Sequence, residues 1–366
     1  MSVNKIYMRS AFLLLLLVYI AANSYLFLRV WQTISGIPFW CKVIIAFIFW
    51  IMAFSMFAAV GMRDSDIPDS LLKPMFRVGA IWMAFLLYMV MLLLLLDFAG
   101  IFIKSIGNPL LIALPVTLVL LGYGYIHYSH PEIENIEISL EKKADILPVR
   151  IAAVSDIHLG YGTDISSLEK YVDLINSQKP DLVLIAGDLI DNSVGPLQNE
   201  PYAEVLSAID APLGVYMVPG NHEYISGIEA CKDFLDNTSV KLLVDSLVTL
   251  PGGIQLIGRD DRTNSERKSL EELLSGADRT RPVIVLDHQP YELGIADSLG
   301  VDIQISGHTH RGQLWPLSIA VDHMYEQSHG YRKWSAAHIW VSSGLSLWGP
   351  PFRIGTDSEM AVFILK

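Results

Sequence analysis

Four long apolar runs without a charged residue constrain the fold of this chain more than any other feature. They cover residues 10–28, 43–62 and 78–96, and a fourth uncharged stretch covers 105–131, apolar from about 110 to 125. Each run is close to the ~20 residues that an α-helix needs to cross the roughly 30 Å of hydrocarbon in a bilayer. We therefore expect four transmembrane helices in the first third of the chain.

Two other interpretations of these runs carry less weight. Buried helices of a soluble protein would need a very large polar shell to cover four such runs in succession. A cleaved signal peptide would account for Lys5, Arg9 and the leucines at 13–17. However, apolar residues continue to Leu28, beyond any cleavage site near Ala22. The first run is therefore expected to remain in the protein as a membrane span.

Charge divides the chain into two parts that suit different solvents. The whole chain is 52% hydrophobic and 17% charged, which is less charge than the ~25% usual in soluble proteins. The first 130 residues contain eight Lys and Arg and four Asp and Glu, a net charge of +4, so the remainder must carry −16 to reach the total of −12. We therefore expect a membrane domain at 1–130, a linker with an edge strand at 131–147, and a water-exposed domain at 148–366.

The predicted spans contain no Asp, Glu, Lys or Arg. A transporter or a proton relay usually needs such a residue within the bilayer. The first part of the chain is therefore interpreted as an anchor that could also bind lipid, rather than as a transporter.

The distribution of positive charge predicts the orientation of the anchor. With four spans, the side that holds both ends of the anchor carries seven Lys and Arg, and the other side carries three. Cytoplasmic loops are enriched in these residues, so we expect a multi-pass membrane protein with a cytoplasmic C-terminal domain. The seven are Lys5, Arg9, Arg63, Lys73, Arg77, Lys142 and Lys143, and the three are Arg29, Lys42 and Lys104.

After the anchor, short apolar runs alternate with amphipathic segments. This alternation predicts strands followed by helices, which is typical of a layered α/β domain. The expected strands are 133–140, 150–154, 182–186, 214–218, 254–257, 283–286, 301–305, 338–341 and 361–365, and the expected helices are 166–177, 204–209, 228–236, 270–274 and a short one near Leu293.

Five groups of polar residues follow directly after five of these strands. Ligands lie beyond the carboxyl ends of strands in open α/β sheets, so we expect the groups to meet at one site. Five histidines are concentrated there, and neutral imidazole is a common metal ligand. The groups are Asp156-Ile157-His158, Gly187-Asp188-Leu189-Ile190-Asp191, Gly220-Asn221-His222-Glu223, Asp287-His288 and Gly307-His308-Thr309-His310.

The chemistry of these groups points to two metal ions. Imidazole and carboxylate ligands together suit Zn, Mn or Fe. The groups offer too many ligands for one tetrahedral ion, whereas two ions about 3.5–4 Å apart would use them all. A carboxylate that bridges two cations offsets their repulsion, and a water shared by two ions is a ready nucleophile near neutral pH. The sequence therefore predicts a site for two divalent ions, whose identity it leaves open.

In this order, the five groups resemble the motifs of the calcineurin-like metallophosphoesterase superfamily, over residues 148–366. The ending Ser342-Ser343-Gly344 followed by Gly349-Pro350-Pro351-Phe352-Arg353 is similar to the membrane-associated branch of that superfamily. The resemblance implies an α/β layered β-sandwich and a metal-dependent phosphoester hydrolase. Related members include hydrolases of UDP-diacylglucosamine and of phospholipids, so the resemblance permits a lipid or nucleotide-lipid substrate without selecting it.

The resemblance also implies a role for each residue of the site. One set of residues would bind the first metal ion, one carboxylate would bridge, and another set would bind the second ion. In that order they are Asp156, His158 and His310; Asp188; and Asn221, His288 and His308.

The remaining roles concern the leaving group and the phosphate. His222 is implied to assist the leaving group as a proton donor or electrostatic stabiliser, and Asp191 to orient it. A buried carboxylate partner would favour the imidazolium form that an acid needs. Arg311 and Arg353 are candidates for contacts with phosphate oxygens, although the branch is expected to have Gly where Arg311 stands. Glu223 is interpreted as an ordinary carboxylate at a helix start.

We therefore expect a membrane-anchored hydrolase of a phosphate ester or pyrophosphate that acts through a metal-bridging hydroxide. Nucleic acid is an unlikely substrate, because a domain at −16 lacks the basic surface that backbone binding needs. A catalytically degenerate signalling or scaffold protein is disfavoured by the intact ligand set. A transporter with an attached phosphatase is disfavoured by the uncharged spans. The residues leave the natural substrate and the oligomeric state open.

Overall fold

The computed structural model describes residues 3–103 and 107–366, with side chains from residue 13 onward. Contacts between Cα atoms divide the chain into two units, residues 1–62 with 70–124 and residues 63–69 with 125–366. Lys104, one of the cations counted on the far side of the membrane, and Ser105, where the fourth run starts, lie outside the described residues.

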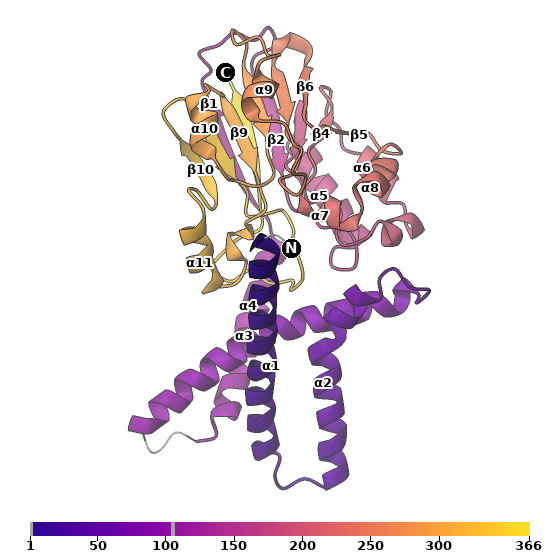
Figure 1. Cartoon of the computed structure of the whole chain (residues 1–366), viewed down its shortest axis with the longest axis vertical. Coiled ribbons are helices and arrows are strands. Elements are labelled where there is room, and N and C mark those ends of the chain that lie inside the picture. Colours follow the sequence, from indigo (N-terminus) through magenta and orange to yellow (C-terminus); the bar gives the residue numbers. More distant parts are fainter. Residues whose placement is uncertain (1–2, 104–106) are drawn as a thin grey trace. The chain divides into compact units, whose positions relative to one another are not determined.

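The first unit is built of four long apolar helices (Figure 1). Each overlaps one of the predicted runs and is long and apolar enough to cross a membrane, so the prediction of four long apolar helices is confirmed. Three of them extend past their runs, which makes Arg29, Lys42 and Asp97 helical. The helices are α1 (Val3–Thr33), α2 (Phe39–Gly61), α3 (Asp69–Phe102) and α4 (Pro109–Ser129).

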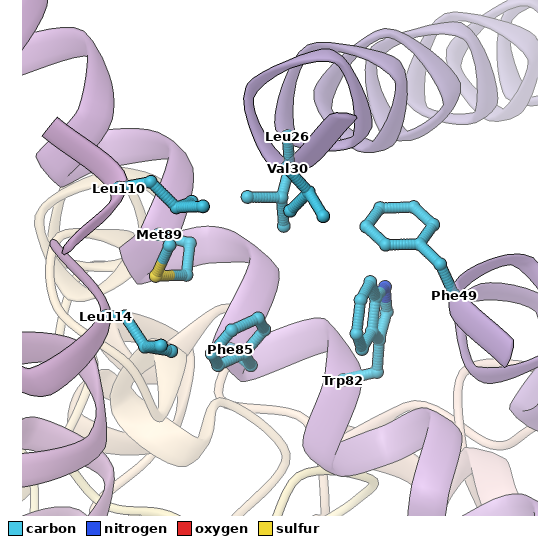
Figure 2. A pocket seen from close by; sticks show the side chains of 8 residues that line it. All are labelled: Leu26, Val30, Phe49, Trp82, Phe85, Met89, Leu110 and Leu114. Atoms are coloured by element: carbon cyan, nitrogen blue, oxygen red, sulfur yellow. The ribbon is translucent and has the colours of Figure 1, made fainter. Parts of the chain in front are cut away.

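Apolar side chains form the interior of the first unit, and several polar side chains of this unit pair with one another. Nε1 of Trp82 donates a hydrogen bond of 2.9 Å to Oδ1 of Asn23, and Arg29 forms an ion pair with Asp97. A cavity of about 200 Å³ lies between the four helices, and only apolar residues line it (Figure 2). The lining residues are Leu26, Val30, Phe49, Trp82, Phe85, Met89, Leu110 and Leu114.

Two six-stranded sheets pack face to face in the second unit. In the first sheet, β2 to β5 are parallel, β12 is antiparallel to β2, and β1 lies parallel beside β12. The second sheet has four parallel strands between two antiparallel edges. The first sheet follows the order β1 (Glu132–Ile138), β12 (Glu359–Leu365), β2 (Val149–Val154), β3 (Leu182–Ile185), β4 (Val215–Met217), β5 (Val240–Leu242). The second follows β10 (Gly330–Lys333), β11 (His338–Val341), β9 (Ile303–Ser306), β8 (Val283–Leu286), β7 (Gln255–Gly258), β6 (Ser246–Thr249).

The alternation of side chains along each strand explains the layers. Ile151 of β2 joins the core between the two sheets, and its neighbour Ala152 joins the core on the outer face. Helices cover both outer faces. They are α5 (Ile165–Ser177), α6 (Tyr202–Ser207) and α8 (Ile228–Leu235) on the first sheet, and α9 (Leu270–Leu274) and α10 (Leu293–Ser298) on the second.

The prediction of a layered α/β domain with a β-sandwich is confirmed, and each of the nine predicted strands overlaps a strand of the structure. Three strands and two α-helices of the described residues were not predicted. They are β5, β6, β10, α7 (Asn221–Ser226) and α11 (Leu317–Met324).

The direction of β1 fixes where the chain enters this unit. β1 is parallel to β12, which is antiparallel to β2, so β1 starts at the edge of the sheet where β2 ends. The amide N of Glu132, its first residue, donates a 2.8 Å hydrogen bond to the carbonyl O of Ser358 at that edge. The segment after α4 therefore enters the domain at the carboxyl ends of β2 and β3.

Candidate metal centre

The predicted ligands follow the carboxyl ends of β2, β3, β4, β8 and β9 and converge at one edge of the sandwich. Several of them adopt a left-handed backbone conformation that is uncommon outside glycine. Such conformations cluster at functional sites, where the surrounding structure holds them. The φ values are 56° for Asp156, 52° for His158, 52° for Asp188, 73° for His308 and 46° for His310.

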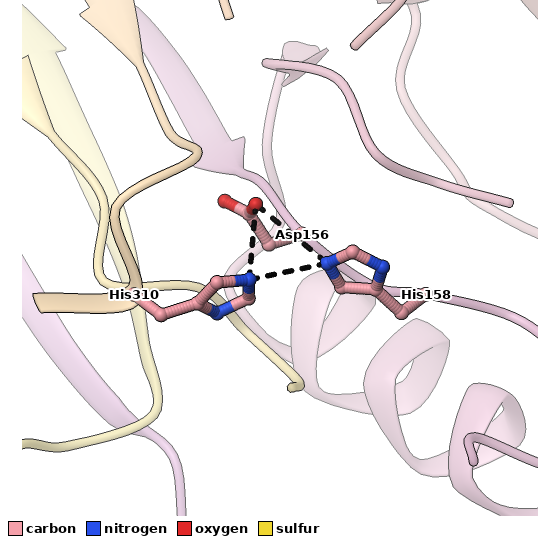
Figure 3. Close-up of side chains that lie close together, drawn as sticks. All are labelled: Asp156, His158 and His310. Carbon is pink, nitrogen blue, oxygen red and sulfur yellow. Dashed lines mark hydrogen bonds and ion pairs between the residues drawn. The ribbon is translucent and has the colours of Figure 1, made fainter. Parts of the chain in front are cut away.

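The first group of ligands comprises Asp156, His158 and His310, whose side chains point toward one another (Figure 3). Oδ1 of Asp156 lies 3.8 Å from Nε2 of His158 and 3.5 Å from Nε2 of His310. The two Nε2 atoms are 3.2 Å apart. Two imidazole nitrogens that face one another beside a buried carboxylate form a donor set that a divalent cation fits.

The second group comprises Asp188, His288 and His308. Nδ1 of His288 contacts the carbonyl O of Ala186 at 2.7 Å. This contact places the proton on Nδ1 of the neutral ring and leaves Nε2 free to bind a metal. That Nε2 is buried, has no hydrogen bond among the described residues, and lies 3.2 Å from Oδ2 of Asp188. Asn221 joins the group, with Oδ1 at 2.8 Å from Nδ1 of His308.

Asp188 lies between the two groups. The same Oδ2 atom that is 3.2 Å from His288 is 3.8 Å from Nε2 of His158. Its other oxygen accepts a 2.9 Å hydrogen bond from the amide N of His222. A carboxylate in this position can be shared by two cations. The donor set therefore fits two divalent ions.

A histidine and a carboxylate lie beside the two groups. Nδ1 of His222 is 2.7 Å from Oδ1 of Asp191, and the same oxygen is 3.8 Å from Nδ1 of His158. Burial acts to raise the pKa of Asp191, but contacts with His158 and His222 outweigh it and lower that pKa. His222 keeps 13% of its side chain exposed, so it can reach a substrate. These three residues also have the geometry of a metal group, a possibility that metal counting can test.

Glu223 takes part in the site, which the sequence argument missed. Its side chain is fully buried and accepts hydrogen bonds from the amides of Asp188, Ile190 and Gly220 at 3.1, 2.9 and 2.7 Å. Burial and the nearby charge of Asp188 raise its pKa to about 7. Glu223 thus ties the loop after β3 to the loop after β4. The available signal in the sequence was a glutamate at the third position of a helix whose N-cap residue is glycine.

The two arginines proposed for phosphate contacts lie in different surroundings. Arg353 is fully buried, and burial lowers its pKa to about 10. Its guanidinium donates to the carbonyl oxygens of His310, Gly344 and Ser346 at 2.9, 3.1 and 2.9 Å. This geometry gives no support to a phosphate contact, because the guanidinium of Arg353 uses its hydrogen bonds to hold the backbone of these loops. Arg311 is partly exposed, and its contact with phosphate stays a prediction.

Metal binding is expected to release a proton from this site. Burial acts to lower the pKa of His158, but Asp156 and Asp191 outweigh it and raise that pKa to about 10. Burial lowers the pKa of His310 to about 3, so that ring is already neutral. At pH 8 the metal-free site therefore holds a proton on His158, which a metal must displace. Calorimetric titration of the chelator-treated protein with Mn²⁺, in buffers of different ionisation enthalpy, should show at least one proton released per chain. A binding enthalpy independent of the buffer would contradict this assignment.

Comparisons with known proteins cover the part of the chain that contains this site. Residues 149–312, which contain all the proposed ligands, match the family model described as Calcineurin-like phosphoesterase. The chain is 35% identical over 268 residues to an uncharacterized metallophosphoesterase of Helicobacter pylori, covering 70% of each chain. It is 28% identical over 374 residues to an uncharacterized metallophosphoesterase of Campylobacter jejuni, covering 96% of this chain and 97% of that one. It is 32% identical over 273 residues to a Danio rerio transmembrane protein with metallophosphoesterase domain, covering 70% and 62%.

Proposed function

Because the chain belongs to the calcineurin-like metallophosphoesterase family, we propose that it is a membrane-anchored phosphoester hydrolase with two divalent metal ions. The observation that carries the proposal is the position of Asp188 between two Asp/His groups. In this assignment one ion would be held by Asp156, His158 and His310, and the other by Asn221, His288 and His308. When bound, the two ions lower the pKa of a water for attack and neutralise charge on the phosphoryl oxygens.

The protein's own residues divide the remaining work. Asp188 would supply the negative charge that both cations share. His222 faces the leaving group, either donating a proton to its oxygen or stabilising the charge that develops there. Asp191, at 2.7 Å from Nδ1 of His222, orients the ring. Glu223 holds the two loops that carry Asp188 and His222.

The proposed substrate is a phosphoester or pyrophosphate of a membrane lipid. Four long apolar helices support membrane attachment, and the charge bias of the loops supports a cytoplasmic second unit. An anchor of this kind concentrates an enzyme where lipid substrates lie. A soluble phosphoester is the alternative, in which case the helices only locate the enzyme.

A second candidate function is a scaffold that binds metal without turnover. The complete set of Asp, Asn and His side chains favours the enzyme, because a scaffold has no need of His222 and Asp191 beside the ions. A measurement of phosphoester hydrolysis distinguishes the enzyme from the scaffold.

The test is hydrolysis by the full-length protein in detergent with added Mn²⁺. The panel contains a chromogenic phosphomonoester, a chromogenic phosphodiester, a diacyl phospholipid and UDP-diacylglucosamine. We expect turnover of at least one compound, and preference for an acylated compound supports the lipid substrate. Two bound metals per chain with no turnover of any compound would favour the scaffold.

A further inference from the structure

One helix of the second unit exposes apolar side chains where a soluble helix exposes polar ones. In α11, Leu317, Ala320 and Met324 follow one another at helical spacing and are exposed, with 48% of Leu317 and 66% of Met324 accessible. The polar Ser318 of the same helix is buried. Surface helices normally turn polar residues outward. With Trp315 and Ile319, which are also exposed, these residues form what we call the α11 face.

The α11 face lies next to the metal centre. α11 starts seven residues after His310. Just past its end, the ring of Tyr325 lies 6.4 Å from the ring of His308, and the hydroxyl of Thr309 donates to the carbonyl O of Ser328 at 2.6 Å. Both ends of α11 are thus joined to the loop that carries His308 and His310.

The chain enters the second unit at this same edge. β1 starts where β2 ends, beside the first metal group. The last turn of α4 belongs to this unit, and the hydroxyl of Tyr128 lies 3.4 Å from Oγ of Ser346. The amide N of Ser346 donates to the carbonyl O of Asp156 at 3.2 Å. The last turn of α4 is therefore linked through Ser346 to Asp156, a proposed metal ligand.

We propose that the α11 face inserts into the boundary between the headgroups and acyl chains of the bilayer, and so holds the metal centre at the level of the lipid phosphates. Apolar side chains of this kind bind membranes by burying themselves about 5–10 Å below the headgroups. Exposed apolar patches on soluble domains mark such interaction surfaces. The proposal rests on the membrane attachment assigned above, and it explains why the substrate would be a lipid phosphoester: its phosphate already lies where the metals are.

Depth measurements test the surface directly. The full-length protein with Cys41→Ser is given a single surface cysteine by Ile319→Cys or Met324→Cys, labelled with an environment-sensitive dye, and placed in liposomes. Lys143→Cys is the matched control, because Lys143 is exposed and follows β1 at the opposite edge of the sheet. Lipids brominated in their acyl chains should quench the labels at 319 and 324 by roughly half and leave the label at 143 unchanged. Equal quenching at all three positions, or none at 319 and 324, would overturn the proposal.

Activity provides a second, independent arm. Ile319→Glu with Met324→Glu should lower kcat/KM for a phospholipid in liposomes about tenfold or more, and leave hydrolysis of a soluble chromogenic diester unchanged. Equal loss on both substrates would indicate misfolding and count against a surface role. If a second copy of the chain covers the α11 face, the label at 319 is shielded from water but is not quenched by brominated lipid. That result would also reject insertion of the face into the bilayer. If no compound is hydrolysed by the unmutated protein, the quenching result still stands, so failure of the proposed function is distinguishable.

Discussion

Asp188→Asn is expected to lower kcat for a chromogenic phosphoester about 10³-fold, a loss of roughly 4 kcal/mol of transition-state stabilisation. Asn has nearly the same size as Asp but lacks the negative charge that two cations would share at this position. Oδ2 of Asp188 faces His158 on one side and His288 on the other, so the substitution weakens both ion sites at once. Metal analysis should show fewer than two ions per chain.

A matched control separates this effect from general damage to the fold. Asp302→Asn makes the same chemical change at another carboxylate that is mostly shielded from solvent. That carboxylate accepts hydrogen bonds from Nζ of Lys142 and from the amide of Val283. Asp302 precedes β9, at the end of the sheet away from the ligands. The control should keep two metals and normal activity. Full activity of Asp188→Asn would contradict the bridging role and favour the scaffold.

His222→Gln is expected to lower kcat about 10²- to 10³-fold for esters with a poor leaving group, and much less for nitrophenyl esters. A nitrophenolate departs without a proton, whereas an alkoxide needs one. The plot of log kcat against leaving-group pKa should therefore become steeper in the variant. Asp191→Asn should act in the same direction but more weakly, because it removes only the partner that orients the ring.

The number of metal ions bound by His222→Gln is the control for this prediction. If His222 serves the leaving group, His222→Gln retains two ions per chain. Loss of one ion would instead make His222 a ligand, together with His158 and Asp191, whose atoms also form a possible metal group. An equal loss of kcat for all leaving groups would likewise contradict a role in protonation.

Much of the fold could be predicted because its signals are local. Uncharged runs of about 20 residues identified the four helices, and short apolar runs identified nine strands. The missing elements lack such signals. α11 was missed because it lacks a buried apolar stripe: Leu317 and Met324 are exposed, whereas Ser318 is buried. β5 contains only three residues, Val240–Leu242, too few for a periodic pattern.

The metal groups could be predicted because their residues follow strands in short motifs, and parallel strands bring their ends together. The surroundings of Arg353 could not be predicted. An arginine after a glycine-rich segment suggests a phosphate contact, but only the folded chain shows that its guanidinium is enclosed by the carbonyl oxygens of four loop residues. Glu223 was undervalued for the same reason, because its partners are main-chain amides distant in sequence.

The position of β12 has a consequence for biosynthesis. This strand, formed by Glu359–Leu365, lies between β1 and β2, which are made more than 200 residues earlier. Until it leaves the ribosome, β1 has no partner and β2 has an open edge, so the first sheet cannot close during translation. Nascent chains must therefore wait with exposed strand edges, which invite aggregation. Chains that stop short of residue 359 should be recognised by proteases rather than accumulate as partly active enzyme.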